Sequence, residues 1–225
     1  MQQKHRTAPG SLQVVIAIFD VDGTLVDSVK AHASAWQDVL REFGHEVPFD
    51  DIRQQIGKGS DEFLKAFLSA EEIEASETII AERRVEIFKR DYMQLIRPFP
   101  GVRSVFERMK KRGDKIVLGT SAKTEELQSY LHLLQIDDLI DGKTSADDAD
   151  KSKPHPDIFQ AALAKVKGAK PEDATVYGDT PYDAEAAVRG GMRAVGVLTG
   201  GFSEKQLRDA GCSEVYPEVS AILRT

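Results

Sequence analysis

The chain of 225 residues has a single cysteine, Cys212, and no long hydrophobic run. One cysteine excludes an internal disulfide and a metal site built from several cysteines. The longest purely apolar run, residues 14–19, is far shorter than the roughly 20 residues of a membrane-spanning helix. It is also too short for the core of a secretion signal, so we expect a protein of the reducing cytoplasm without a membrane partner.

An excess of positive charge is also missing. The 30 Lys and Arg residues stand against 37 Asp and Glu residues, which gives a formal net charge of −7. An acidic chain of this kind is a poor candidate for general binding of nucleic acid. With 41% hydrophobic and 30% charged residues, the composition is typical of a globular protein with a sizeable core. The length indicates one domain, or one domain that carries an insertion.

Four short apolar runs have the length of β-strands, and most are rich in Val and Ile. They cover residues 14–19, 115–119, 175–178 and 194–198. Because polar residues do not alternate within them, both faces of these strands should be covered, as in a parallel sheet. Helical patterns lie between the runs: Val102, Val105, Phe106 and Met109 precede Gly113, and Pro156 precedes Ile158, Phe159, Ala162 and Val166. Alternating strands and helices predict an α/β fold.

The stretch between the first and second strands breaks this alternation. Residues 28–97 contain no convincing strand, and Ile73, Ile80 and Ile87 recur there every seven residues. The stretch ends in RPFPG, residues 97–101, which predicts a rigid extended link. We therefore expect a flexible tail at residues 1–12, an α/β core at residues 13–27 and 98–225, and a helical cap at residues 28–97. A cap that leaves the carboxyl end of a strand is well placed to cover a ligand there.

Polar residues suited to phosphate or cation binding stand at four expected strand ends. They are Asp20 and Asp22, Thr120 and Ser121, Lys153 in the loop 151–157, and Asp179 and Asp183. Singly, each group also fits an ordinary turn, helix cap or exposed loop. The carboxyl ends of parallel strands meet at one edge of the sheet, however, where ligands of open α/β folds bind. Asp20 and Asp22, at positions i and i+2, would face one site if the strand stays extended.

The clustering of carboxylates predicts a cofactor. Close carboxylates repel one another by several kcal/mol unless a cation neutralises them, so a hard divalent cation is expected. Oxygen ligands with water left in the coordination shell suit Mg²⁺. The hydroxyl and backbone donors of Thr120 and Ser121, together with Lys153, would then hold a phosphate beside the metal.

The motifs at these positions resemble those of a known family. Residues 20–28, DVDGTLVDS, are similar to the first motif of the haloacid dehalogenase-like hydrolase superfamily. Thr120 resembles the second motif, Lys153 the third, and GDTPYD, residues 178–183, the fourth. Within the superfamily, the chain resembles the phosphoglycolate phosphatase and beta-phosphoglucomutase branch. This resemblance implies a Rossmann-like core with helices on both faces and an inserted all-α cap.

The resemblance also implies a role for each matched residue. Asp20 would be the nucleophile that forms an aspartyl-phosphate, and Asp22 would be the general acid and base. Mg²⁺ would be bound by the Asp20 carboxylate, the Asp22 backbone carbonyl and Asp179, with Asp183 supporting the metal. The phosphoryl oxygens would be held by Thr120 and Lys153.

The expected function is therefore a Mg²⁺-dependent phosphomonoester hydrolase that acts on a small phosphorylated metabolite. A sugar phosphomutase of the same branch is the main alternative, because the mutases resemble this chain at His32 and Trp36. Mutases usually carry Arg in the cap loop, whereas IGKGSD, residues 56–61, has none, and Gly178 stands where they tend to have Glu. A non-catalytic module that binds phosphate or Mg²⁺ is the remaining alternative.

Two cap residues are candidates for contact with substrate, namely His32 and Lys58. Each also has an ordinary interpretation, His32 as a polar position on a cap helix and Lys58 as a solvated loop charge. The particular phosphate ester and the oligomeric state stay open at this level.

Overall fold

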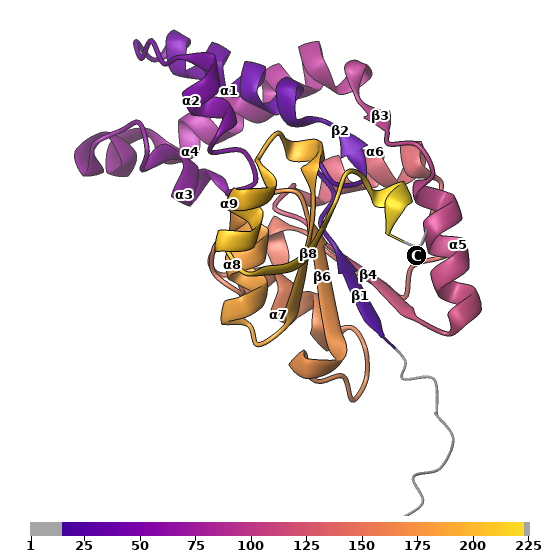
Figure 1. Ribbon diagram of the computed structural model, residues 1–225. Helices are drawn as coiled ribbons and strands as arrows, with labels where there is room; N and C mark the ends of the chain where they lie inside the picture. The colour runs from indigo at the N-terminus through magenta and orange to yellow at the C-terminus, as the bar shows by residue number, and fades with distance from the viewer. Residues whose placement is uncertain (1–14, 223–225) are drawn as a thin grey trace, which may run out of the picture.

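A six-stranded sheet forms the centre of the molecule, in the order β5-β4-β1-β6-β7-β8 (Figure 1). The computed structural model describes residues 15–222, so the tail predicted at residues 1–12 lies outside the described residues. Neighbouring strands of this sheet run parallel. The strands are β1 (Ile16–Phe19), β4 (Lys115–Gly119), β5 (Gly142–Thr144), β6 (Ala174–Gly178), β7 (Arg193–Val197) and β8 (Cys212–Tyr216). The predicted α/β fold with a parallel sheet is confirmed.

The two edge strands, β5 and β8, do not correspond to any of the predicted apolar runs. β5 has three residues, and β8 contains Ser213 and Glu214. A strand at the edge of a sheet is covered on fewer sides than a central strand. It therefore does not need the continuous apolar run by which the four central strands were predicted.

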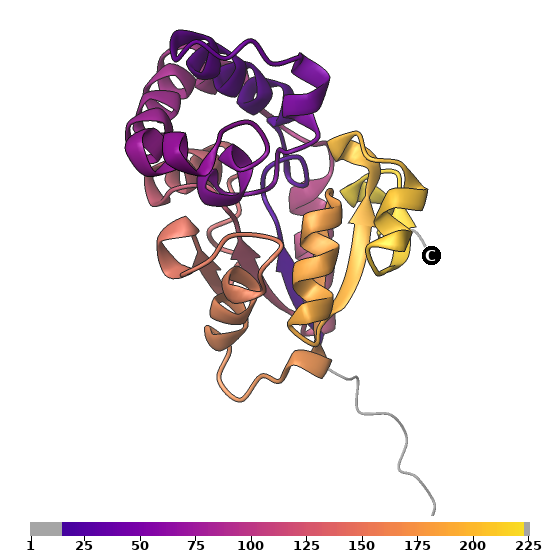
Figure 2. The ribbon, with the colours of Figure 1, turned by 90° about the vertical axis from the view of Figure 1, so that its left-hand side faces the viewer.

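Alternating side chains of β1 build the cores on the two faces of the sheet. Ile16 and Ile18 pack in one cluster with α7 (Asp157–Ala164), α8 (Pro181–Arg189) and α9 (Glu204–Asp209). Ala17 and Phe19 pack in the other cluster with α5 (Val102–Arg112) and α6 (Thr124–Leu134). Figure 2 shows α8, in orange, in front of the strands. The sheet is thus covered on both faces, as its uninterrupted apolar runs predict.

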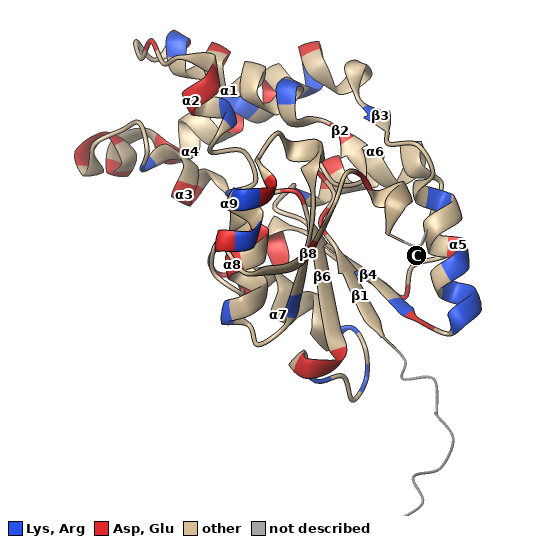
Figure 3. Ribbon diagram, in the orientation of Figure 1, with Lys and Arg blue, Asp and Glu red and all other residues tan. Residues whose placement is uncertain are grey.

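Helices α5 and α7 show how local signals set the helix ends. α5 buries the four predicted apolar residues and ends at Gly113, whose φ of 91° suits glycine. Its last turn is basic, blue in Figure 3, which complements the negative end of the helix dipole. α7 ends at Ala164, earlier than its predicted pattern, so Val166 lies beyond the helix. Val166 still packs against the same core.

A helical insertion leaves the sheet after β1 and returns before α5. It contains α1 (Val29–Glu42), α2 (Phe49–Arg53), α3 (Ser60–Leu64), α4 (Ala70–Ile87), the π-helix η1 (Phe88–Tyr92) and the 3-10 helix η2 (Met93–Leu95). Its ends are joined by an antiparallel ribbon of β2 (Val26–Asp27) and β3 (Arg97–Pro98). We call this insertion the cap. It lies over the carboxyl ends of the central strands (Figures 1 and 2).

The seven-residue isoleucine repeat falls in α4. Ile80 and Ile87 are buried, and Ile73 is partly buried against the same core. The helix starts with a capping box, in which the Ser69 side chain accepts a hydrogen bond from the Glu72 N–H and the Glu72 carboxylate accepts one from the Ser69 N–H. The repeat therefore marks the side of α4 that packs inward.

Short 3-10 helices connect the remaining elements. They are η3 (Ala146–Asp148), η4 (Pro171–Asp173), η5 (Leu198–Gly200) and η6 (Val219–Ala221). Among residues 15–222, no helix has both the length and the apolar character needed to span a membrane.

Candidate active site

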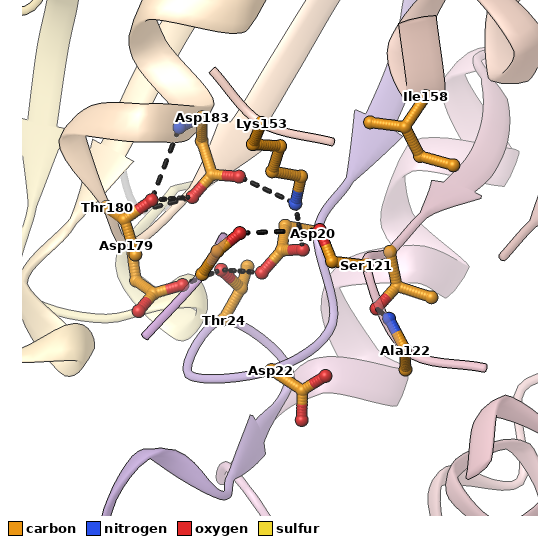
Figure 4. Close-up of polar contacts among 12 residues, drawn as sticks. Asp20, Asp22, Thr24, Ser121, Ala122, Lys153, Ile158, Asp179, Thr180 and Asp183 are labelled. Carbon is orange, nitrogen blue, oxygen red and sulfur yellow. Dashed lines mark hydrogen bonds and ion pairs between the residues drawn. The ribbon is translucent and has the colours of Figure 1, made fainter. Parts of the chain in front are cut away.

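Three buried carboxylates meet at the carboxyl end of the sheet (Figure 4). Asp20 follows β1, Asp179 follows β6, and Asp183 lies in the first turn of α8. Oxygens of the three carboxylates lie within 4.8 Å of one another, and each residue is at most 4% exposed. The structure thus brings together three of the acidic residues that the sequence singles out.

Local hydrogen bonds explain where two of these carboxylates point. The Asp20 N–H donates to the Tyr177 carbonyl over 2.9 Å, which continues the pairing of β1 with β6 by one residue. Thr180 caps α8, and its hydroxyl accepts from the Asp183 N–H over 3.2 Å. The Asp183 carboxylate in turn accepts from the Thr180 N–H and hydroxyl over 3.0 and 2.7 Å. This capping box turns Asp183 back toward the strand ends.

Lys153 supplies the positive charge of the cluster. Its Nζ lies 2.5 Å from Asp20 Oδ1 and 2.8 Å from Asp183 Oδ1, and the residue is 1% exposed. Burial favours loss of the proton, but the nearby Asp183 and Asp20 carboxylates outweigh burial and raise the pKa of Lys153. Lys153 therefore stays charged, as one cation against three carboxylates.

The carboxylate cluster is short of positive charge. Burial is the largest cause that raises the pKa of Asp20 from 3.8 to about 7, with Lys153 opposing and the charges of Asp183 and Asp22 adding to the rise. Burial, then the charges of Asp20 and Asp183, also raises the pKa of Asp179 well above its usual value. Burial and mutual repulsion of the carboxylates thus outweigh the stabilising charge of Lys153 at both residues.

An orphaned oxygen shows where a cation fits. Thr24 Oγ1 donates to Asp179 Oδ1 over 2.8 Å, whereas the buried Asp179 Oδ2 has no hydrogen-bond partner in the part of the chain that the structure describes. Two glycines keep the space beside Oδ2 clear, because a Cβ on Gly23 or Gly200 would lie 2.2 or 2.0 Å from that atom. A hard divalent cation with oxygen ligands fits this donor set.

Asp22 lines the same cavity as Asp20 but does not join this carboxylate cluster, because the chain does not stay extended after Asp20. The strand ends at Phe19, and the Val21 carbonyl then accepts from the N–H groups of Thr24, Leu25 and Val26. This turn breaks the period-two alternation, so the Asp22 side chain points away from the other carboxylates (Figure 4).

The Asp22 carboxylate instead meets His32 of the cap. Its Oδ1 accepts from the Ser28 hydroxyl over 2.7 Å and lies 2.7 Å from His32 Nε2. Burial would raise the pKa of Asp22, but His32 and these hydrogen bonds outweigh burial and hold that pKa well below its ordinary value. Both contacts end on Oδ1, and Asp22 also lines the cavity described below.

A polar network behind His32 was not predicted from the sequence. His32 Nε2 lies 3.0 Å from the Tyr130 hydroxyl, which donates to Glu126 over 3.0 Å. Arg84 of α4 contacts His32 Nδ1 and donates to Glu126 over 3.4 Å. Glu126 and Tyr130 are one helical turn apart on α6, so the only sequence signal for them was a polar pair inside a core helix. The network joins the cap to the core around Asp22.

Thr120 and Ser121 lie at the end of β4, on the other side of Asp20. The Thr120 hydroxyl oxygen accepts from the Ala122 N–H over 3.0 Å, which leaves its proton to donate. Ser121 donates to the carbonyl of Gly57 in the cap over 3.3 Å and lines the pocket described next. Their predicted role as phosphate ligands stays a prediction.

A cavity of about 370 Å³ opens between the cap and these strand ends. Asp20, Asp22, His32 and Lys58 all line it, and its volume is in the range of small-molecule sites. Lys58 accordingly faces the cavity, where its ammonium donates to Gln55 over 2.6 Å. Burial lowers the pKa of Lys58. The two predicted cap residues therefore share this pocket with Asp20, Asp22 and Ser121, whereas Thr120, Lys153, Asp179 and Asp183 do not line it.

Comparison with known proteins identifies a family that this chain matches. Residues 17–197 match the family model described as haloacid dehalogenase-like hydrolase. The phosphoglycolate phosphatase of Aquifex aeolicus is 31% identical, over 82% of this chain and 85% of that protein. The phosphorylated carbohydrates phosphatase of Thermotoga maritima is 30% identical, over 89% of this chain and 94% of that protein.

Two further proteins are similar to this chain, one over nearly its whole length and the other over a small part of its length. A solved structure of a hydrolase from Pseudomonas syringae is 29% identical, with a TM-score of 0.82 over 91% of this chain and 94% of that one. The chloroplastic protein SUPPRESSOR OF QUENCHING 1 of Arabidopsis thaliana is 32% identical over 93% of this chain. This chain spans only 20% of that plant protein's length.

Proposed function

The chain belongs to the haloacid dehalogenase-like hydrolase family, and on this premise we propose that it is a Mg²⁺-dependent phosphomonoester hydrolase that works through an aspartyl-phosphate. One observation carries the proposal: among residues 15–222, the buried cluster of Asp20, Asp179 and Asp183 is paired with one cation, Lys153, and has a carboxylate oxygen without a hydrogen-bond partner. Such a cluster is suited to hold a phosphate only together with a divalent cation.

Asp20 is the proposed nucleophile. One of its oxygens attacks the phosphorus, a bond from Asp20 to phosphorus forms, and the ester bond to the leaving oxygen breaks. Lys153 lies 2.5 Å from Asp20 Oδ1 and is buried, so its ammonium is placed to bind phosphoryl oxygens beside the nucleophile. Thr120 is proposed to donate its hydroxyl proton to the same group.

Asp22 is the proposed general acid and base. It delivers a proton to the leaving oxygen, and it then takes a proton from the water that cleaves the aspartyl-phosphate. The low pKa that His32 gives Asp22 suits the second duty, because the carboxylate is ionised and ready to accept a proton. The negative charge of a bound phosphate ester raises that pKa, which suits the first duty.

Asp20, Asp179 and Asp183 are the side chains proposed to hold Mg²⁺ directly or through water, with the Asp22 backbone carbonyl as a further ligand. When bound, the cation supplies neutralisation of the phosphate and carboxylate charges, so that an anionic nucleophile can approach an anionic phosphate.

The substrate is proposed to be a small phosphorylated metabolite. A cavity of about 370 Å³ suits an ester of that size, and the two bacterial relatives are named for phosphoglycolate and for phosphorylated carbohydrates. His32 and Lys58 both line this cavity, so both cap candidates are proposed as substrate contacts.

A sugar phosphomutase is the second candidate, favoured by the placement of His32 on Asp22 in the pocket. Gly178 disfavours it in this chain. A Cβ at position 178 would lie 2.4 Å from the Asp183 Cβ, so the Glu of the mutases does not fit this arrangement. We therefore keep the hydrolase as the conclusion.

A phosphate-release screen over a panel of phosphomonoesters, with Mg²⁺ and then with a chelator, tests the proposal. We expect release that requires Mg²⁺ and is poor with Ca²⁺, whose looser coordination misplaces the reacting groups. Full activity in chelator contradicts the metal assignment. An isomerised sugar phosphate that keeps its phosphate identifies the mutase instead.

A further inference from the structure

One segment of the cap, residues 54–61, comprises the loop before α3 and the start of α3, and it contacts the core in three places; we call it the cap loop. The Tyr182 hydroxyl of α8 donates to the Gln54 carbonyl over 2.6 Å, and the Lys58 ammonium lies 4.6 Å from the centre of the Tyr182 ring. Ser121, after β4, donates to the Gly57 carbonyl over 3.3 Å. The third contact falls on the loop that carries Lys153.

Asp61, at the end of the cap loop, accepts two hydrogen bonds from Ser152. One comes from the Ser152 hydroxyl, and the other from the Ser152 N–H over 3.4 Å. Ser152 directly precedes Lys153, whose buried ammonium bridges Asp20 and Asp183. A carboxylate that receives both a backbone and a side-chain donor of one residue fixes the position and the orientation of that residue.

Two glycines permit this close approach of the cap loop. A Cβ on Gly59 would lie 2.6 Å from the Ser152 Cβ, and a Cβ on Gly57 would lie 2.8 Å from Thr180 Cγ2. Thr180 caps the helix that carries Asp183. Gly57 and Gly59 of the cap loop therefore pack directly against Thr180 and Ser152. These two residues lie close in the chain to Asp183 and Lys153.

We propose that Asp61 is a positioning residue, which from the cap holds Ser152 and thereby sets Lys153 for binding of the phosphoryl group. The proposal rests on the proposed phosphatase function. Because the contact joins the cap to the core, it exists only while the cap lies on the core. Asp61 therefore links closure of the cap to correct placement of Lys153, and phosphoryl transfer is favoured once the substrate is enclosed.

Asp61→Ala is the decisive variant, measured with p-nitrophenyl phosphate and with an alkyl phosphate in Mg²⁺. We expect kcat to fall about 10- to 100-fold on both substrates, with KM changed less, because a small displacement of a positioning group impairs the reaction step. Asp61→Asn keeps an acceptor for the Ser152 hydroxyl and should lose less. Glu62→Ala is the matched control, because Glu62 shares the first turn of α3 but pairs with Lys65 on the surface.

A double-mutant cycle separates positioning from general support of the fold. If Asp61 acts through Ser152, the double variant of Asp61→Ala and Ser152→Ala should be no slower than Asp61→Ala alone. Ser152→Ala alone should be milder, since its backbone N–H still reaches Asp61. Losses that simply add would overturn the proposal, as would Asp61→Ala and Asp61→Asn variants as active as Glu62→Ala.

Hydrogen exchange supplies a readout that needs no activity. The amide of Ser152 should exchange faster in Asp61→Ala than in the parent or in Glu62→Ala, and unchanged exchange contradicts the contact. A parent protein that releases no phosphate from any ester would overturn the proposed function itself. If the parent is active and substitution of Asp61 leaves its activity unchanged, only the proposed role of Asp61 is overturned.

Discussion

Asp20 and Asp22 stand two residues apart in the chain, yet their surroundings are opposite in electrostatic character. Asp20 lies among carboxylates, and burial first, then neighbouring charges, raises its pKa to about 7. Asp22 lies against the cap, where His32 and Ser28 hold its pKa well below the ordinary value. The turn at Val21 is what sends the two side chains into different environments.

The difference explains how one motif can supply two duties. A nucleophile beside Lys153 and a cation needs its negative charge only once those partners are in place. The proposed acid and base, Asp22, must exchange a proton with a changing partner, and its side chain lies apart from the carboxylate cluster and against His32 of the cap. Two carboxylates whose surroundings push their pKa values apart are suited to two different roles.

The largest expected effect comes from removing the carboxylate charge of Asp20. Asp20→Asn should abolish phosphate release, because a carboxamide neither attacks phosphorus well nor binds Mg²⁺ well. Steady-state assays with purified protein, and circular dichroism to check the fold, measure this. Turnover within tenfold of the parent would contradict the assignment of Asp20 as the nucleophile.

The corresponding substitution of Asp22 should slow turnover by an amount that depends on the leaving group of the substrate. Asp22→Asn should slow alkyl phosphates about 10²- to 10⁴-fold, because their leaving oxygen needs a proton. Aryl phosphates with acidic leaving groups need that proton less, so their first step should be slowed less. Equal losses on both substrate classes, compared in single-turnover assays, contradict the acid role.

Removing His32 should make the surroundings of Asp22 more like those of Asp20. Burial then raises the pKa of Asp22 against the hydrogen bonds from Ser28 and Tyr130 alone, so the ionised base is lost at a higher pH as the solution is acidified. We expect His32→Ala to lower kcat roughly 10- to 100-fold near neutral pH and to move the acidic limb of its pH profile upward. His45→Ala, whose partly exposed ring pairs with Glu72, is the control. An unmoved limb means that His32 does not set the pKa of Asp22.

The smallest expected effect is on stability without metal. The folded-state pKa of Asp20 is about 7 and its ordinary value is 3.8, so the unfolded chain gives up this proton first. Stability in chelator should therefore fall as pH rises from about 4 to about 7. Asp20→Asn should raise Tm in chelator by a few degrees at pH 8 and little at pH 4.

The control for that measurement is Asp209→Asn, an exposed position on α9 that pairs with Lys205. Scanning calorimetry across this pH range should show no such pH-dependent gain for it. A parent whose Tm in chelator does not depend on pH between 4 and 7 contradicts the raised pKa of Asp20.

Local patterns allowed the prediction of much of the fold and of the carboxylate cluster. Central strands such as β1 and β4 are uninterrupted apolar runs, and Asp20 and Asp179 directly follow β1 and β6. Parallel strands bring their carboxyl ends to one edge, so topology alone collects these residues.

Contacts between distant segments could not be predicted in this way. The turn of Asp22 toward His32 depends on three N–H groups that share the Val21 carbonyl, which a period-two pattern does not encode. Glu126 meets His32 across 94 positions of the chain, and Asp61 meets Ser152 across 91. The residues next to Asp61 and Glu126 in the chain do not indicate these distant partners.

The most direct test of the account is to find where the phosphoryl group goes. Asp22→Asn, incubated with an aryl phosphate and Mg²⁺ and quenched in acid, should carry about 80 Da of added mass from one phosphoryl group. Peptide mapping should place that mass on Asp20. A trapped group on any other residue, or none at all in a variant that still turns over alkyl phosphates at the parental rate, would contradict the division of labour between Asp20 and Asp22.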